Sequence, residues 1–186
     1  MNFLKCSLLI LVILPVLNAC GGSANKSAYY QAYQQSLEDT EAFAVNDNTV
    51  KAFGEIFANL QNDTLPGILD AVYAERFYFN DTFRTIRDKP ALTHYLQQTG
   101  ETVDSINVTI NDVARSNNDV YVRWSMNMQF SVFGKAISSD SVGITHLRFN
   151  EEGEIILHQD FWDGADAFYQ HLPVIGLWLR QIRSQL

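Results

Sequence analysis

One run of alternating residues constrains the fold of this chain more than any other feature. Between Val120 and Val132 every second residue is apolar, and the residues between them are polar, with one tyrosine among them. Side chains on a strand alternate between its two faces, so this period of two predicts a long β-strand with one buried face. The apolar positions are Val120, Val122, Trp124, Met126, Met128, Phe130 and Val132.

Shorter alternating runs surround this strand, and all of them follow Gly100. They predict further strands at residues 106–111, 139–150 and 154–162. A turn over residues 150–153 would join the last two strands as a hairpin. Consecutive strands joined in this way are typical of an antiparallel sheet.

The apolar residues before Gly100 recur at helical spacing instead. Thr64 and Asp88 are predicted N-caps, and Gly100 is predicted to end the third helix. A short aromatic strand, Phe77–Phe79, separates the second helix from the third. Three helices followed by antiparallel strands predict an α+β domain with the helices on one face of the sheet. The predicted helices cover residues 48–60, 64–72 and 88–100.

The segment 164–186 is predicted to form an amphipathic C-terminal helix, interrupted at Pro173 and Gly176. Burying a large apolar side chain contributes roughly 1.5–3 kcal/mol, so an apolar face left in water would be unfavourable. We expect the helix to dock on the domain as a lid, and contact with a membrane surface is the alternative. The apolar residues are Val174, Ile175, Leu177, Trp178 and Ile182.

The N-terminus carries a targeting pattern. Lys5 precedes the apolar run Leu8–Val16, which is too short for a membrane-spanning helix of about 20 residues. Residues 17–20, Leu-Asn-Ala-Cys, complete a pattern typical of a secretory signal. The pattern resembles a bacterial lipobox, in which Cys20 is acylated and becomes the first residue of the mature chain.

These observations predict the organisation and the location of the protein. We expect a lipoprotein signal peptide over residues 1–19, a polar tether over 20–45, a folded domain over 46–163 and the C-terminal helix. Gly21 follows the acylated cysteine, whereas an Asp there would favour retention in the inner membrane. We therefore expect a lipid-anchored protein on the periplasmic side of the outer membrane, with the inner membrane or secretion as alternatives.

Composition excludes several classes of function. The net charge of −8 argues against a nucleic-acid surface, which needs a basic patch. The two cysteines, Cys6 and Cys20, would be lost with the signal or acylated, so no thiol remains for a disulfide, a zinc site or a nucleophile. The sequence has no glycine-rich phosphate loop and no recognised spacing of metal ligands, so we expect neither a metal nor an organic cofactor.

Two stretches carry a family resemblance. The first is Tyr73–Asp81 with the following helix Pro90–Leu96, and the second is Arg148–Ile155, which runs on to Trp162. They resemble the first strand with its terminal Asp, the third helix and the last hairpin of the nuclear transport factor 2-like superfamily. That superfamily includes SnoaL-like polyketide cyclases and ketosteroid isomerases. The resemblance implies a cone-shaped domain, in which three helices and a curved, mostly antiparallel sheet enclose an apolar pocket.

The resemblance also assigns roles to single residues. In the isomerases the Asp that closes the first strand is the general base, and here that position is Asp81. Their two acidic hydrogen-bond donors, a Tyr and a protonated Asp, correspond to Phe57 and Thr145, which cannot stabilise an oxyanion in the same way. We therefore expect no appreciable steroid isomerase activity.

A second polar set lies on the last strand. His158, Asp160 and Trp162 share a face, and the resemblance implies that this face lines the pocket. With Asp81 across the pocket, His158 and Asp160 could form an acid–base set. The alternative is a structural role, in which these groups hydrogen-bond one another, the backbone or an Arg. The expected ligand-pocket residues are Phe57, Phe79, Trp124, Met126, Thr145 and Trp162.

The sequence thus leaves two functions of different classes open. The first is a membrane-anchored module that binds a small hydrophobic molecule. The second is a cofactor-free cyclase, dehydratase or isomerase that uses Asp81, His158 and Asp160. A third possibility is an interaction protein, which would bind a partner or form a homodimer through the polar outer face of the sheet.

Overall fold

The computed structural model describes residues 27–185. The chain divides into two units, Met1–Ala32 and Tyr33–Leu186, and each is described by itself. Residues 27–32 of the first unit contain the start of helix α2 (Ala28–Asp39). The predicted signal peptide and the predicted acylation site, Cys20, lie outside the described residues.

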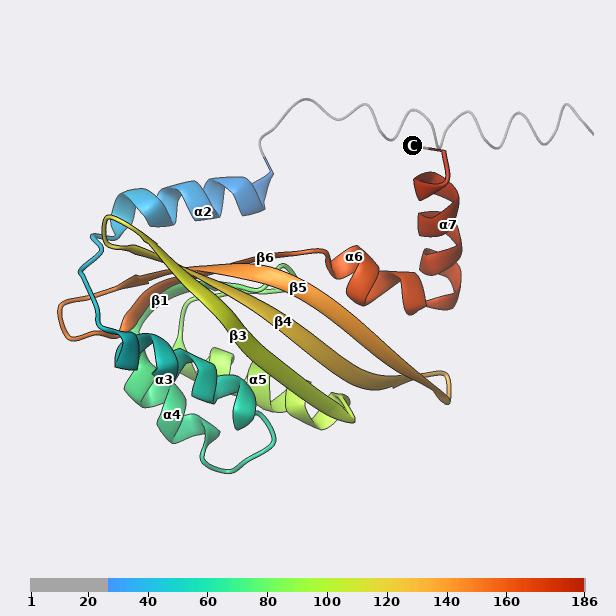
Figure 1. The fold of residues 1–186 in the computed structure, drawn as a ribbon, viewed down its shortest axis with the longest axis horizontal. Coiled ribbons are helices and arrows are strands. Elements are labelled where there is room, and N and C mark those ends of the chain that lie inside the picture. The colour runs from blue at the N-terminus through green and yellow to red at the C-terminus, as the bar shows by residue number, and fades with distance from the viewer. Residues whose placement is uncertain (1–26, 186) are drawn as a thin grey trace, which may run out of the picture. The chain divides into compact units, whose positions relative to one another are not determined.

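The larger unit is built on one six-stranded sheet with the strand order β2-β1-β6-β5-β4-β3 (Figure 1). β1 pairs with β6 in parallel, and every other neighbouring pair is antiparallel. The alternating runs after Gly100 form the four long strands, and the predicted aromatic strand is the end of a longer β1. The strands are β1 (Tyr73–Asn80), β2 (Thr85–Ile86), β3 (Ser105–Ser116), β4 (Asp119–Val132), β5 (Lys135–Phe149) and β6 (Ile155–Trp162).

Three helices lie on one face of this sheet, which confirms the predicted α+β class (Figure 1). Asp88 caps the third helix, since its Oδ1 accepts a hydrogen bond from the N–H of Ala91 at 2.9 Å. Thr64 stands at the start of the second helix but makes no capping hydrogen bond with its side chain. The helices are α3 (Asp47–Ala58), α4 (Leu65–Val72) and α5 (Lys89–Thr102). The side chains buried between helices and sheet include Phe53, Ile56, Leu69, Leu92, Val122, Leu147, Phe149 and Ile155.

Gly100 does not end α5, contrary to the prediction. The helix continues to Thr102, and Gly100 is buried within its last turn. A Cβ atom on Gly100 would lie 2.5 Å from the backbone oxygen of Leu60. The glycine therefore permits a close approach between two backbone segments, rather than a left-handed helix end.

Residues 20–45 were predicted to be a polar tether. Residues 33–43, which belong to the larger unit, instead contact the sheet. The Tyr33 hydroxyl is 2.8 Å from His146 Nδ1, and the N–H of Phe43 donates to the carbonyl of Phe149 at 2.9 Å. Arg148 Nη1 donates to the carbonyl oxygens of Leu37 and Thr40 at 2.8 and 2.9 Å. The last carbonyls of a helix have no partner within it, so this guanidinium holds the end of α2 on the sheet.

The C-terminal segment forms two helices and a 3-10 turn rather than one interrupted helix. The elements are α6 (Gly164–Ala167), η1 (Tyr169–His171) and α7 (Pro173–Arg183). Pro173 starts α7, where its missing N–H costs no hydrogen bond, so the predicted break at this residue is found. Gly176 does not interrupt the helix. It lies inside α7 at a close contact, where an added Cβ would be 2.0 Å from the backbone oxygen of Gln170.

The expectation that this helix docks by its apolar face is wrong. Helix α7 is held by its polar side, because Arg180 Nη1 donates to the carbonyl of Gln170 at 3.0 Å and Arg183 pairs with Asp163 and Asp166 at 2.7 and 2.9 Å. The opposite face is exposed to solvent, and no helix within residues 27–185 is long and apolar enough to cross a membrane. The exposed apolar residues are Val174, Ile175, Leu177, Trp178 and Ile182.

Candidate functional site

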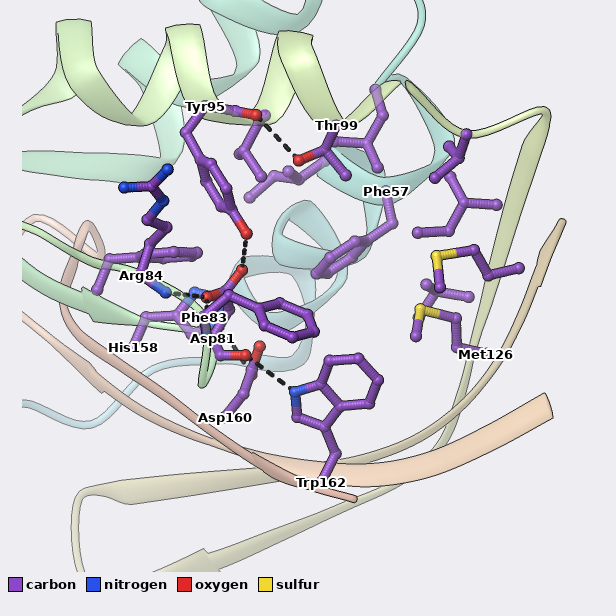
Figure 2. A pocket seen from close by; sticks show the side chains of 18 of the residues that line it. Phe57, Asp81, Phe83, Arg84, Tyr95, Thr99, Met126, His158, Asp160 and Trp162 are labelled. Atoms are coloured by element: carbon purple, nitrogen blue, oxygen red, sulfur yellow. Dashed lines mark hydrogen bonds and ion pairs between the residues drawn. The ribbon is translucent and has the colours of Figure 1, made fainter. Parts of the chain in front are cut away.

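A cavity of about 390 Å³ lies in the larger unit, lined by residues of α3, α5 and strands β1, β3, β4 and β6 (Figure 2). Most of its wall is apolar or aromatic, and its ionisable groups include Asp81, Arg84, His158 and Asp160. A mostly apolar concavity with a few placed polar groups is the usual form of a small-molecule site. The aromatic lining residues are Phe57, Tyr73, Phe79, Phe83, Tyr95, Trp124, Trp162 and Phe168.

The structure brings five of the six predicted ligand-pocket residues to this cavity, namely Phe57, Phe79, Trp124, Met126 and Trp162. Thr145 does not line it. Thr145 is fully buried on β5, where its Oγ1 accepts a hydrogen bond from the Trp124 indole at 2.9 Å and donates to Asp160 Oδ1 at 2.5 Å. Thr145 therefore orients two lining side chains instead of touching a ligand.

The position of Trp124 depends on a glycine in the neighbouring strand. Gly143 pairs with Trp124 across β4 and β5. A Cβ atom on Gly143 would lie 2.3 Å from the indole, so only glycine lets this ring lie over β5. The ring is then fixed between Gly143 and the hydroxyl of Thr145.

Asp81 sits in a tight turn at the end of β1 and lines the cavity. Its Oδ1 accepts hydrogen bonds from the N–H groups of Phe83 and Arg84 at 3.0 and 2.9 Å, and its Oδ2 accepts one from the Tyr95 hydroxyl. Burial raises the pKa of Asp81, and the donors from Tyr95 and Arg84 offset part of this rise. Asp81 is therefore both a turn residue and a carboxylate of the cavity.

A buried chain of hydrogen bonds runs behind Asp160. The Tyr73 hydroxyl lies 2.6 Å from His158 Nδ1, and His158 Nε2 lies 3.0 Å from Asp160 Oδ1. Both ring nitrogens of His158 are therefore engaged, one by the Tyr73 hydroxyl and the other by the Asp160 carboxylate. Burial raises the pKa of Tyr73 well above its ordinary value, which keeps this hydroxyl a donor.

The three residues of the predicted acid–base set, Asp81, His158 and Asp160, therefore lie at one cavity, but a ligand could not reach all three equally. Asp81 and Asp160 present carboxylate oxygens to it, and no ion pair between either of them and an Arg is found in the described part of the chain. His158 is 1% exposed and uses both ring nitrogens for Tyr73 and Asp160. It positions Asp160 and has no free nitrogen for a ligand.

Sequence reasoning missed four of the aromatic lining residues, Tyr73, Phe83, Tyr95 and Phe168. Tyr95 lies within the predicted third helix, and its hydrogen bond to Asp81 is a tertiary contact with no local sequence signal. Phe168 lies beyond the predicted domain boundary at residue 163. The ring of Phe83 packs edge-on against Trp162 at 5.4 Å and against Phe168 at 5.7 Å, which joins the C-terminal segment to the cavity wall.

The fold and the cavity define a small α+β domain built around a cavity with a largely aromatic wall. The sequence model of the family described as SnoaL-like domain matches residues 50–158, and the chain belongs to this family. No curated protein matches the chain significantly.

Solved structures share this fold at low sequence identity. A protein of ketosteroid isomerase-like fold from Catenulispora acidiphila, in complex with trimethylamine, is 19% identical with a TM-score of 0.56 and covers 69% of this chain and 96% of its own. A protein from Shewanella denitrificans assigned as a SnoaL-like polyketide cyclase is 16% identical with a TM-score of 0.55. The match covers 65% of this chain and 94% of that protein. An epoxide hydrolase of M. tuberculosis is 18% identical with a TM-score of 0.51. The match covers 76% of this chain and 96% of that protein. At these identities the likeness confirms the fold, not the activity.

Proposed function

We propose that this protein binds a small hydrophobic molecule in the cavity between its helices and its sheet. The observation that carries the proposal is the cavity itself, about 390 Å³ in volume and walled by aromatic side chains. Such a wall provides apolar contact area, while Asp81 and Asp160 supply the few polar contacts that fix orientation.

Binding of an uncharged apolar fluorophore, N-phenyl-1-naphthylamine, tests this proposal. Val108 lines the cavity, whereas Val142 is 72% exposed on β5 outside it, so Val108→Phe and Val142→Phe form a matched pair. We expect saturable binding to the wild-type chain and to Val142→Phe, and an affinity at least about tenfold weaker for Val108→Phe, a loss of about 1.4 kcal/mol. Equal binding by both variants would place the fluorophore elsewhere and contradict the proposal.

We further propose that the domain is carried on a bacterial lipoprotein, anchored in the outer membrane through Cys20 and facing the periplasm. Residues 17–20 support this, as does the exposed apolar face of α7, which would suit the surface of a bilayer. In a Gram-negative host, Cys20→Ser should move the protein out of the membrane fraction. A variant that stays bound and uncleaved would show that the N-terminal segment is not a lipoprotein signal.

Cofactor-free acid–base catalysis is the second candidate function. It is favoured by Asp81, whose carboxylate reaches the cavity and whose pKa is raised by burial, and by Asp160, which His158 orients. Structural relatives assigned as a polyketide cyclase and an epoxide hydrolase make apolar carbonyl compounds and epoxides suitable test substrates.

Asp81→Asn separates the two functions. If the protein is a catalyst, this variant should lose turnover of such a substrate by at least about 10²-fold and still bind the fluorophore. Turnover that survives the substitution unchanged would remove Asp81 from the mechanism. We expect no steroid isomerase activity, because the Tyr73 and Tyr95 hydroxyls are both hydrogen-bonded to protein groups and Phe57 has no hydroxyl.

A further inference from the structure

Two Tyr–His–Asp chains occur in the larger unit, one partly buried and one buried, and they differ in which groups contact the carboxylate. In the first, Tyr33 and Asp119 flank His146, with Oη···Nδ1 and Nε2···Oδ1 distances of 2.8 and 2.9 Å. Arg148 then pairs with Asp119, its Nε lying 2.6 Å from Oδ1. Partial burial would raise the pKa of Asp119, but the hydrogen bonds from Arg148 and His146 hold it below its ordinary value.

The second chain lines the cavity and has no such cation. Tyr73, His158 and Asp160 repeat the same order of contacts, but Thr145 occupies the place that Arg148 has in the first chain. Asp160 is only 7% exposed, and its Oδ2 makes no hydrogen bond within residues 27–185. A buried carboxylate normally has a charged partner, so this oxygen is presented to whatever occupies the cavity.

Asp81 adds a second carboxylate to the same cavity. Asp160 contributes to the rise in the pKa of Asp81, after burial, because two like charges in one apolar space disfavour each other. Arg84 is the one Lys or Arg among the lining residues, and Figure 2 shows its side chain running beside Tyr95, away from Trp162 and Met126. Among the described lining residues, two carboxyl groups therefore share the cavity with a single guanidinium.

The walls facing these carboxylates are aromatic. Trp162 lies 6.1 Å from Trp124 and 5.4 Å from Phe83 between ring centroids, and its indole N–H is fixed by the backbone oxygen of Asp81 at 2.9 Å. Phe57 and Phe83 line the same cavity. Aromatic faces attract organic cations through their quadrupole, most strongly where water is excluded.

We propose that the ligand of this cavity is an organic cation, an alkylammonium group carried on an apolar body. The ammonium would lie between the carboxylates of Asp81 and Asp160, and the apolar body would extend along Met126 and Val108. The inference deepens the proposed binding function and rests on it. The ligand would then be the cationic partner of Asp160 in the second Tyr–His–Asp chain, as Arg148 is the cationic partner of Asp119 in the first.

Competition for the cavity with probes of one shape and different charge tests the inference. On the full chain, N-phenyl-1-naphthylamine is displaced by trimethyl(2-phenylethyl)ammonium, by the uncharged 2-methyl-4-phenylbutan-2-ol, or by 4-phenylbutanoate. We expect the ammonium to compete at a concentration at least about tenfold below that of the alcohol, and the carboxylate to compete worst. Equal competition by the ammonium and the alcohol, or stronger competition by the carboxylate, overturns the inference.

Variants that remove one negative charge show which carboxylate causes the preference for the ammonium. Asp160→Asn keeps an acceptor for Thr145 and His158 and removes the charge, so it should abolish the preference for the ammonium. Asp112→Asn removes an equal charge from the exposed face of β3, where Asp112 lies 4.0 Å from Arg123, and should keep the preference. If Asp160→Asn does not fold, Asp81→Asn makes the same test at the other carboxylate.

The outcomes separate this inference from the function on which it rests. Fluorophore binding without any preference for the ammonium contradicts the cationic ligand and leaves the binding function standing. A chain that binds neither the fluorophore nor any competitor contradicts both. A preference for the ammonium that persists in Asp160→Asn and in Asp81→Asn would place the cation outside the cavity and also overturn the inference.

Discussion

Single hydroxyl groups hold the polar side chains of the cavity in place. The Tyr73 hydroxyl is hydrogen-bonded to His158 Nδ1, and the Tyr95 hydroxyl donates to Asp81 Oδ2. Both rings also form part of the apolar wall. At the scale of the residue, the cavity is therefore sensitive to the loss of one oxygen atom.

Tyr73→Phe should lower the free energy of unfolding by about 1–3 kcal/mol, because it leaves a buried imidazole nitrogen without a partner. Urea denaturation of the two chains measures the difference. Tyr169→Phe is the matched control, since the Tyr169 hydroxyl makes no hydrogen bond within residues 27–185 and the ring is 38% exposed. An equal effect of both substitutions would show that the His158 contact contributes nothing to stability.

Asp81→Asn should change how stability depends on pH. Because the pKa of Asp81 is raised above 3.8 in the folded protein, the folded state binds its proton more tightly than the unfolded state does. The contribution of Asp81 to stability is therefore greatest below about pH 4 and falls as the pH rises to the folded pKa. Relative to Asp81→Asn, the free energy of unfolding of the wild-type chain should fall between about pH 4 and the folded pKa of Asp81. Above that pKa the difference should stay constant.

Urea denaturation between pH 3 and pH 8 checks this prediction for both chains. The difference between their free energies of unfolding is the informative quantity, because other titrating groups cancel in it. A difference that does not vary with pH would mean that the Tyr95 and backbone donors fully offset the burial of Asp81.

At the scale of the element, two side chains of β5, His146 and Arg148, hold α2. Arg148 bonds the carbonyls of Leu37 and Thr40 and pairs with Asp119, so it joins the end of the helix to β4 and β5. Hydrogen bonds from a charged donor contribute about 1.5–3 kcal/mol each, more than exposed ion pairs do.

Arg148→Met should free residues 33–43 from the sheet while the rest of the domain stays folded. Hydrogen exchange followed by mass spectrometry should show at least about tenfold faster exchange over this segment, which corresponds to 1.4 kcal/mol. The control is Arg123→Met, because Arg123 forms an exposed pair with Asp112 at 4.0 Å. Unchanged protection of residues 33–43 would show that Tyr33 and Phe43 hold the segment without the guanidinium.

At the scale of the whole molecule, α7 contributes little to the stability of the domain. Gly176 is its one buried residue, and the Arg183 pairs with Asp163 and Asp166 are half-exposed or more. Exposed ion pairs contribute about 0–1 kcal/mol. Its apolar face is therefore available for contact with another surface.

Ending the chain after Leu172 should change the melting temperature by less than about 2 °C, since few contacts are lost. Binding of the chain to zwitterionic lipid vesicles should fall, because the truncation removes the five exposed apolar side chains. A melting temperature lowered by several degrees, with more binding of an apolar dye, would show that α7 covers the domain after all.

The local pattern of this sequence determined its long strands, the helices α3 to α5 and its fold class. The period of two from Val120 to Val132 and the helical spacing before Gly100 depend only on the geometry of one backbone segment, so they can be read without a structure. The shared face of His158, Asp160 and Trp162 follows in the same way, and all three residues reach the cavity.

The tertiary structure alone decided which polar groups meet and which apolar faces are covered. Tyr33 bonds His146 across 113 residues, and Tyr73 bonds His158 across 85, at distances no local period encodes. The same holds for α7, whose apolar pattern implies burial but whose polar face makes the contacts. A periodic pattern specifies the faces of an element, whereas its partner depends on the packing of the whole chain.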